Sequence, residues 1–312
     1  GVDALVRLLE DPEPLVASAA CRAAGRLHNR AYIHSLAGRL AEPAVRAAAI
    51  EGLAAFGTRV CGTLGDMLED DSVALPIRRQ IPRVLKLIPD QRSIDVLIHH
   101  VDQPDLVARH AVLKALNRLR ESVPGLSYHE KTVSARILSE ARHYFELHAA
   151  VQPFRDSSGP RSAANLLART LEERLRLTIE RLFRLLGLRY PLREIYSTYL
   201  AIHRPKTAEY SAALEFLDNT LDRDLKKIVL PVLDTEGPVT ARGMSLFGVE
   251  VPSAENAIRG LIRSGDPWLA ACAVATAAEQ NMKQLEPDVR AAAERDHSEV
   301  AQVARAAAAA LA

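Results

Sequence analysis

The side chains that most often do chemistry lack, in this sequence, the spacing that catalysis or metal binding needs. The ten histidines include an adjacent pair, His99 and His100, whose side chains a helix directs to different faces. His143 and His148 lie five positions apart on one expected helix, a step that does not bring two ligands to one metal ion. The motifs GxxxxGKS/T, GxGxxG, HExxH and GxSxG do not occur. The sequence therefore predicts no catalytic, cofactor-binding or metal-binding residue.

The cysteines and paired carboxylates lead to the same conclusion. Cys21, Cys61 and Cys272 are too few and too scattered for a disulfide framework or a zinc site, which favours a reducing cytoplasmic setting. Asp70 and Asp71 are adjacent and are expected on a solvated helix end, not as an acid–base pair. We therefore expect a protein that is not an enzyme.

The elements that must position these residues follow a repeat of about thirty residues. Six segments place small or apolar residues four and eight positions after an apolar anchor, and the anchors are separated by 29, 32, 30, 162 and 31 residues. The anchors and their followers are Val16 with Ala20 and Ala24, Val45 with Ala49 and Leu53, Ile77 with Ile81 and Leu85, Val107 with Ala111 and Ala115, Leu269 with Ala273 and Ala277, and Val300 with Ala304 and Ala308. Such a period with helical spacing predicts an all-α fold, an α-solenoid of stacked helix pairs. Ala111 and Ala273 should be buried where two helices touch.

Three zones can be separated along the chain. Residues 1–120 and 206–312 carry the helical repeats. Residues 121–205 break the period and are predicted to form a long-helix insertion within the solenoid, with helices over about 127–151 and 161–186. A loop over 153–160, with a proline at each end, joins these two helices into a hairpin.

Composition and charge exclude several classes of function. The chain is 48% hydrophobic but only 4% aromatic, so its core must be built from Ala, Leu, Val and Ile. No apolar run reaches the length of about eighteen residues that predicts a membrane span. The net charge of +1 divides into +2 over residues 1–120 (16 basic, 14 acidic), +4 over 121–205 (13 and 9) and −5 over 206–312 (11 and 16). Because binding to nucleic acid needs a continuous basic stripe, we expect no nucleic-acid partner.

The basic residues and the two ends of the sequence suggest its source. They are 33 Arg and 7 Lys, as in the GC-rich genes of many bacteria. The sequence begins without Met and ends in an alanine-rich helical stretch, which suggests a fragment of a longer polypeptide.

Arginines that recur near the anchors could form a ridge that binds a partner. Arg46 and Arg78 each follow an anchor by one residue, and an alternative is that they bridge to loop acids such as Glu42 and Asp71. The sole tryptophan could staple two repeats together or be an exposed contact residue. The possible partner surface comprises Arg22, Arg46, Arg78, Arg83, Arg155, Arg161, Arg169 and Trp268.

Three segments carry a family resemblance: RLFRLLGLRY (181–190), ALEFLDNTLDRDLKKIVLPVLD (213–234) and RSGDPWLAAC (263–272). They resemble the HEAT-repeat region of large bacterial membrane proteins related to ADP/ATP translocases. In that family the repeats follow a transporter-like domain, and many members carry a cyclic-nucleotide-binding domain after them. Residues 1–120 match only the general HEAT pattern.

The resemblance implies a cytoplasmic regulatory module of a membrane-anchored protein, whose partners are other proteins or adjacent domains of the same polypeptide. Proximity to the membrane surface is a further expectation, because the insertion carries a net charge of +4. No cofactor and no site residue can be transferred from the family. The alternative is a free-standing HEAT-like protein with chemistry on its concave face, similar to the repeat-built DNA glycosylases or bilin lyases. Such a protein would need a pocket with clustered aromatic residues.

Overall fold

The computed structural model describes residues 2–155, 159, 162–204, 207–234, 236–294 and 299–311. Within these ranges every regular element is an α-helix or a short 3-10 helix, and no residue lies in a strand. Many helices that are close in sequence pack against one another. The expected all-α solenoid with a longer helical hairpin in its middle is therefore confirmed.

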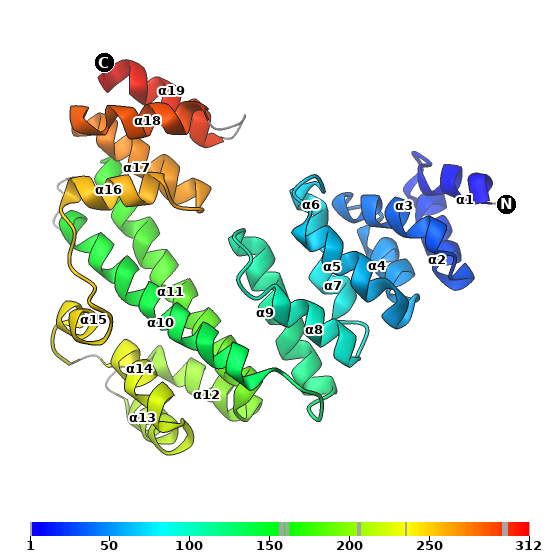
Figure 1. Ribbon diagram of the computed structural model, residues 1–312, viewed down its shortest axis with the longest axis horizontal. Helices are drawn as coiled ribbons and strands as arrows, with labels where there is room; N and C mark the ends of the chain where they lie inside the picture. Colours follow the sequence, from blue (N-terminus) through cyan, green and yellow to red (C-terminus); the bar gives the residue numbers. More distant parts are fainter. Residues whose placement is uncertain are drawn as a thin grey trace. The chain divides into compact units, whose positions relative to one another are not determined.

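The helices form two compact units, Gly1–Arg136 with Arg184–Arg193, and Ile137–Phe183 with Glu194–Ala312. The first contains α1 Val2–Leu9, α2 Pro14–Leu27, η1 Arg30–Tyr32, α3 Ile33–Gly38, η2 Arg39–Ala41, α4 Arg46–Ala54, η3 Gly57–Val60, α5 Cys61–Glu69, α6 Leu75–Arg78, α7 Ile81–Leu85, α8 Gln91–His99 and α9 Leu106–Ser122 (Figure 1). The second contains η4 Gln152–Phe154, α13 Ala208–Thr220, α14 Arg223–Leu233, α15 Val239–Phe247, α16 Ala254–Ile262, α17 Pro267–Glu279, η5 Lys283–Leu285, α18 Glu286–Glu294 and α19 Glu299–Leu311. Three helices have residues in both units: α10 Glu130–Val151, α11 Ala163–Arg189 and α12 Leu192–Ile202.

Most residues that lie four and eight positions after an anchor are buried, but α9 buries a different face from the expected one. Ala273 is fully buried in α17, as predicted. The prediction for Ala111 in α9 is wrong, because this residue is only partly buried. The side chain of Asp105 caps α9 by accepting a hydrogen bond from the N–H of Ala108, at 2.8 Å. The helix buries the face that carries Ala108, and the anchor Val107 is 55% exposed.

The third repeat is also divided where the pattern indicates one continuous helix. Ile77 lies in α6, and its follower Ile81 begins a separate helix, α7. Pro82 causes the division because it has no N–H to donate to the carbonyl of Arg78, four residues earlier.

Two glycines allow the backbones of α2 and α4 to touch in the first unit. A Cβ atom built on Gly25 would lie 2.6 Å from the carbonyl oxygen of Gly52. A Cβ atom built on Gly52 would lie 2.5 Å from the carbonyl oxygen of Cys21 and 3.3 Å from Leu36 Cδ2. Because the nearest atoms belong to the backbone, a larger side chain could be accommodated only if the helices moved apart.

The long hairpin in the middle of the chain is held by an apolar stripe and a buried ion pair. The stripe runs along α11, and all its members are buried: Leu167, Leu171, Leu175, Leu182 and Leu186. Arg181 and Glu140 are both buried, and Arg181 Nε lies 3.2 Å and 3.1 Å from the two carboxylate oxygens. Arg181 also donates to the hydroxyl of Thr178, at 2.9 Å, so the buried charge is well compensated.

A second buried polar group, His148, lies near the end of α10. Burial lowers the pKa of His148 from 6.5 to about 4, with smaller contributions from the charges of Arg155 and Arg242. Arg155 Nη2 lies 3.1 Å from His148 Nε2. Since a guanidinium can only donate, this nitrogen must accept, which requires a neutral imidazole.

We expect Gly52→Ala to destabilise the protein by about 1–3 kcal/mol, because the added methyl group overpacks the contact between α2 and α4. Urea unfolding followed by circular dichroism measures this change. Gly260→Ala is the matched control: it occupies the same position in a nine-residue helix, but its Cβ would meet no atom within 4 Å. The control should be neutral or slightly stabilising. Equal unfolding midpoints for Gly52→Ala and the parent would contradict the backbone contact.

We expect the protein to lose about 2 kcal/mol of stability through His148 when the pH falls from 7.5 to 5. Over this range the unfolded state binds a proton with a pKa near 6.5, whereas the folded state resists protonation until about pH 4. Acidification therefore favours unfolding. Unfolding free energies of the parent and of His148→Gln, measured across this range, test the expectation. The variant should show a shallower pH dependence, and identical slopes would rule out His148 as the source.

Candidate functional site

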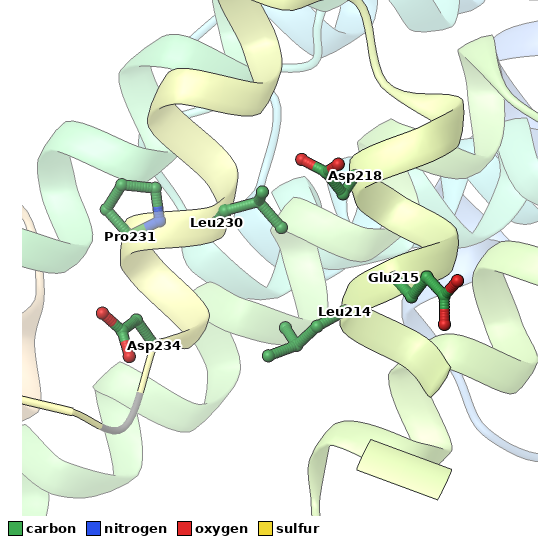
Figure 2. Close-up of a pocket in the computed structure, with 6 residues that line it drawn as sticks. All are labelled: Leu214, Glu215, Asp218, Leu230, Pro231 and Asp234. Carbon is green, nitrogen blue, oxygen red and sulfur yellow. The ribbon is translucent and has the colours of Figure 1, made fainter. Parts of the chain in front are cut away.

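The described part of the second unit contains a pocket of about 410 Å³ between α13 and α14. Most of the two helices lies in the segment ALEFLDNTLDRDLKKIVLPVLD, whose leucines and valines include the fully buried Leu217 and Val229. Figure 2 shows the six lining residues on the two helices. They are Leu214, Glu215, Asp218, Leu230, Pro231 and Asp234.

The pocket combines an apolar floor with an acidic rim. Leu214, Leu230 and Pro231 are partly buried, so their apolar surfaces remain open to a ligand. Glu215 and Asp218 are exposed and lie three positions apart on α13, on neighbouring sites of one helix face. This arrangement can bind a group that is apolar along its length and cationic at its end.

The C-terminal end of α14 is held in place by one arginine of α15. Arg242 donates to the carbonyls of Pro231 at 3.0 Å, Asp234 at 2.8 Å and Glu236 at 2.6 Å. Its Nη1 is also 3.7 Å from the Asp234 carboxylate. These bonds satisfy acceptors that a helix end leaves free, and they fix Pro231 and Asp234 at the pocket.

Lys226 is the second cation near the rim. Its Nζ lies 3.2 Å from Asp218 Oδ1, and both side chains are substantially exposed. An exposed ion pair of this kind contributes at most about 1 kcal/mol, so a partner could displace the lysine at little cost.

Two arginines of the expected partner surface bind acceptors within the first unit. Arg22 Nε is 2.7 Å from Glu51 on the next repeat, with both side chains about half exposed. Arg83 donates to the Gln80 side chain at 2.9 Å. Both are exposed residues whose polar atoms have a partner within the protein.

The other two arginines of the first unit connect helices to loops. Arg78 lies 2.7 Å from Asp71, the expected loop acid. Arg46 does not reach Glu42; its Nε donates to the carbonyl of Leu40 at 2.8 Å. The first turn of α4 lies beside the end of η2. The carbonyls there have no partner within the helix, and they accept hydrogen bonds from the guanidinium of Arg46.

Among the described residues, no hydrogen bond or ion pair joins the expected surface residues of the second unit to one another. Arg155 is exposed but bonds to His148, and Arg169 is exposed on α11. Arg161 lies outside the described residues. Trp268 is 48% exposed at the start of α17, where Asp266 caps its N–H at 3.0 Å, so this tryptophan can serve as a contact residue.

The pocket was not predicted from the sequence, although all its lining residues lie in the segment over 213–234 that carries the family resemblance. From that segment we predicted a family resemblance only, and Glu215, Asp218 and Asp234 were not expected as site residues. Pro231 was the available signal, because a proline inside a helix removes a hydrogen bond and often marks a functional break.

The described residues contain no group of three or more His, Cys, Asp or Glu side chains that could hold a metal ion. His99 and His100 do not point to different faces as expected: their Nε2 atoms lie 2.9 Å and 3.5 Å from the same oxygen of Glu69. The reason is that His100 follows the last residue of α8 and has left helical geometry. None of the helices described is long and apolar enough to cross a membrane.

The match to known families agrees with this architecture. Residues 36–117, from α3 to α9, match the family model of HEAT repeats. No curated protein matches the chain. HEAT repeats generally serve as non-enzymatic scaffolds that bind other proteins. The match covers 82 of the 312 residues, about a quarter of the chain, and agrees with the helical repeats found there.

Proposed function

We propose that this chain is a non-enzymatic interaction module, and specifically the cytoplasmic regulatory HEAT region of a bacterial membrane protein similar to ADP/ATP translocases. Its partners would be proteins or adjacent domains of the same polypeptide. The three segments that resemble this family, over 181–190, 213–234 and 263–272, support the specific part of the proposal. The HEAT-repeat match supports the general part.

The α13–α14 pocket is the observation that carries the interaction function. Its floor is apolar and its rim is charged, which is the composition of a site that binds a side chain of a partner. None of its six lining residues is aromatic, whereas the glycosylase-like or bilin lyase-like alternative would need an aromatic pocket.

Proximity to a membrane surface is part of the proposal. On α11, the exposed Arg169 lies three positions from Leu166, which is 44% exposed, so a basic and an apolar side chain share one helix face. Arg155 adds an exposed positive charge in the same insertion. Such a combination suits contact with anionic lipid.

We expect the chain to sediment with phosphatidylcholine vesicles that contain phosphatidylglycerol, at low salt, and not with phosphatidylcholine alone. Arg155→Glu with Arg169→Glu should weaken this binding by about tenfold or more, since each basic residue near an anionic surface contributes about 1 kcal/mol. Lys283→Glu with Arg305→Glu is the matched control, because it changes the net charge equally at exposed sites outside the insertion. Equal binding to both lipids, or an equal effect of the two variants, would exclude the membrane-facing role.

A further inference from the structure

We propose that the α13–α14 pocket binds an arginine side chain presented by a basic, apolar segment of a protein partner. This inference rests on the interaction function proposed above and names the chemistry of the partner. The proposal follows from the floor of the pocket, the charge of its rim and the break in α14.

The floor fits the stem of a long cationic side chain. Leu214 and Leu230 extend from the two helices into the space between them (Figure 2), and Pro231 is the third apolar residue that lines the pocket. Arginine and lysine pack their methylene groups along such a surface while the charged end reaches solvent or an acid. An acidic or neutral polar side chain would gain nothing from this floor.

The rim determines the sign of the charge that binds. Glu215, Asp218 and Asp234 line one pocket, and residues 208–234 carry six acidic and three basic residues, a net charge of −3. Arg242 neutralises Asp234 only in part, because its guanidinium donates to backbone carbonyls and lies 3.7 Å from that carboxylate. The rim is therefore complementary to a cation and repels an anionic lipid or peptide.

The break in α14 favours arginine over lysine. Pro231 has no N–H and cannot bond to the carbonyl of Lys227, one turn earlier. The carbonyl of Lys227 is therefore left without its helical donor, one turn before Pro231, which lines the pocket. A guanidinium has five N–H donors in a planar fork and can reach a carboxylate and a carbonyl together, whereas an ammonium presents one compact charge.

Random peptides displayed on phage and selected against the intact chain provide the test. Enriched peptides are expected to carry arginine next to leucine, isoleucine or phenylalanine. Fluorescence anisotropy then measures their Kd for the parent and for Glu215→Gln with Asp218→Asn, which removes two charges at exposed positions without changing side-chain shape. We expect the Kd to rise by about tenfold in this variant. Glu236→Gln with Glu250→Gln is the matched control, with the same change in charge at exposed sites outside the pocket.

Replacement of the peptide arginine by citrulline, its neutral isostere, links the effect to the pocket. Citrulline should weaken binding to the parent by about tenfold and have little effect on binding to the pocket variant, because the same contact has already been removed. Replacement by lysine should weaken binding to a smaller extent.

The outcomes separate this inference from the function on which it rests. Enriched peptides that lack basic residues, or that bind the pocket variant and the parent equally, would overturn the arginine site and leave an interaction module that binds elsewhere. A selection that enriches no peptide would overturn the arginine site as well. The vesicle experiment above tests the membrane part of the proposed function separately.

Discussion

The structure depends on the close approach of helices that present small residues to one another. With few aromatic residues available, the contacts are made by alanine and glycine, as where Gly25 and Gly52 bring the backbones of α2 and α4 together. Helices at this separation lose little volume to voids but have no room for an added methyl group. Each repeat therefore relies on its neighbour, since a thin layer of this kind cannot bury its apolar face alone.

Arginine side chains connect the layers where apolar contacts end. Arg46 and Arg242 donate to carbonyls at the ends of preceding helices, and Arg79 forms a two-bond contact with Asp105 at 2.9 Å and 2.7 Å. Arg174 reaches Asp266, the residue that caps α17, at 2.5 Å. In each case the guanidinium satisfies acceptors at a helix end or loop, so many of the chain's arginines have structural roles. This limits which arginines remain for a partner surface.

The pocket between α13 and α14 arises from the same packing rule. Leu217 and Val229 are fully buried, but the α13–α14 contact does not cover Leu214 and Leu230, and Pro231 replaces a helical hydrogen bond with a ring. Carboxylates line the pocket beside this uncovered surface, which is the basis of the proposed cation site. A scaffold of this kind acquires a binding site where its stacking is locally incomplete.

The sequence by itself determined the helical period and the burial of Ala273, because helical spacing depends on residues close together in the chain. It also indicated that the familiar catalytic motifs do not occur. The tertiary structure alone decided that α9 turns Ala111 partly away from the core, and that Arg46 binds backbone carbonyls instead of Glu42. It also decided that two acids of α13 and Asp234, which follows α14, line one pocket. These features depend on how neighbouring helices cross and on which side-chain atoms then meet, and a linear pattern does not contain that information.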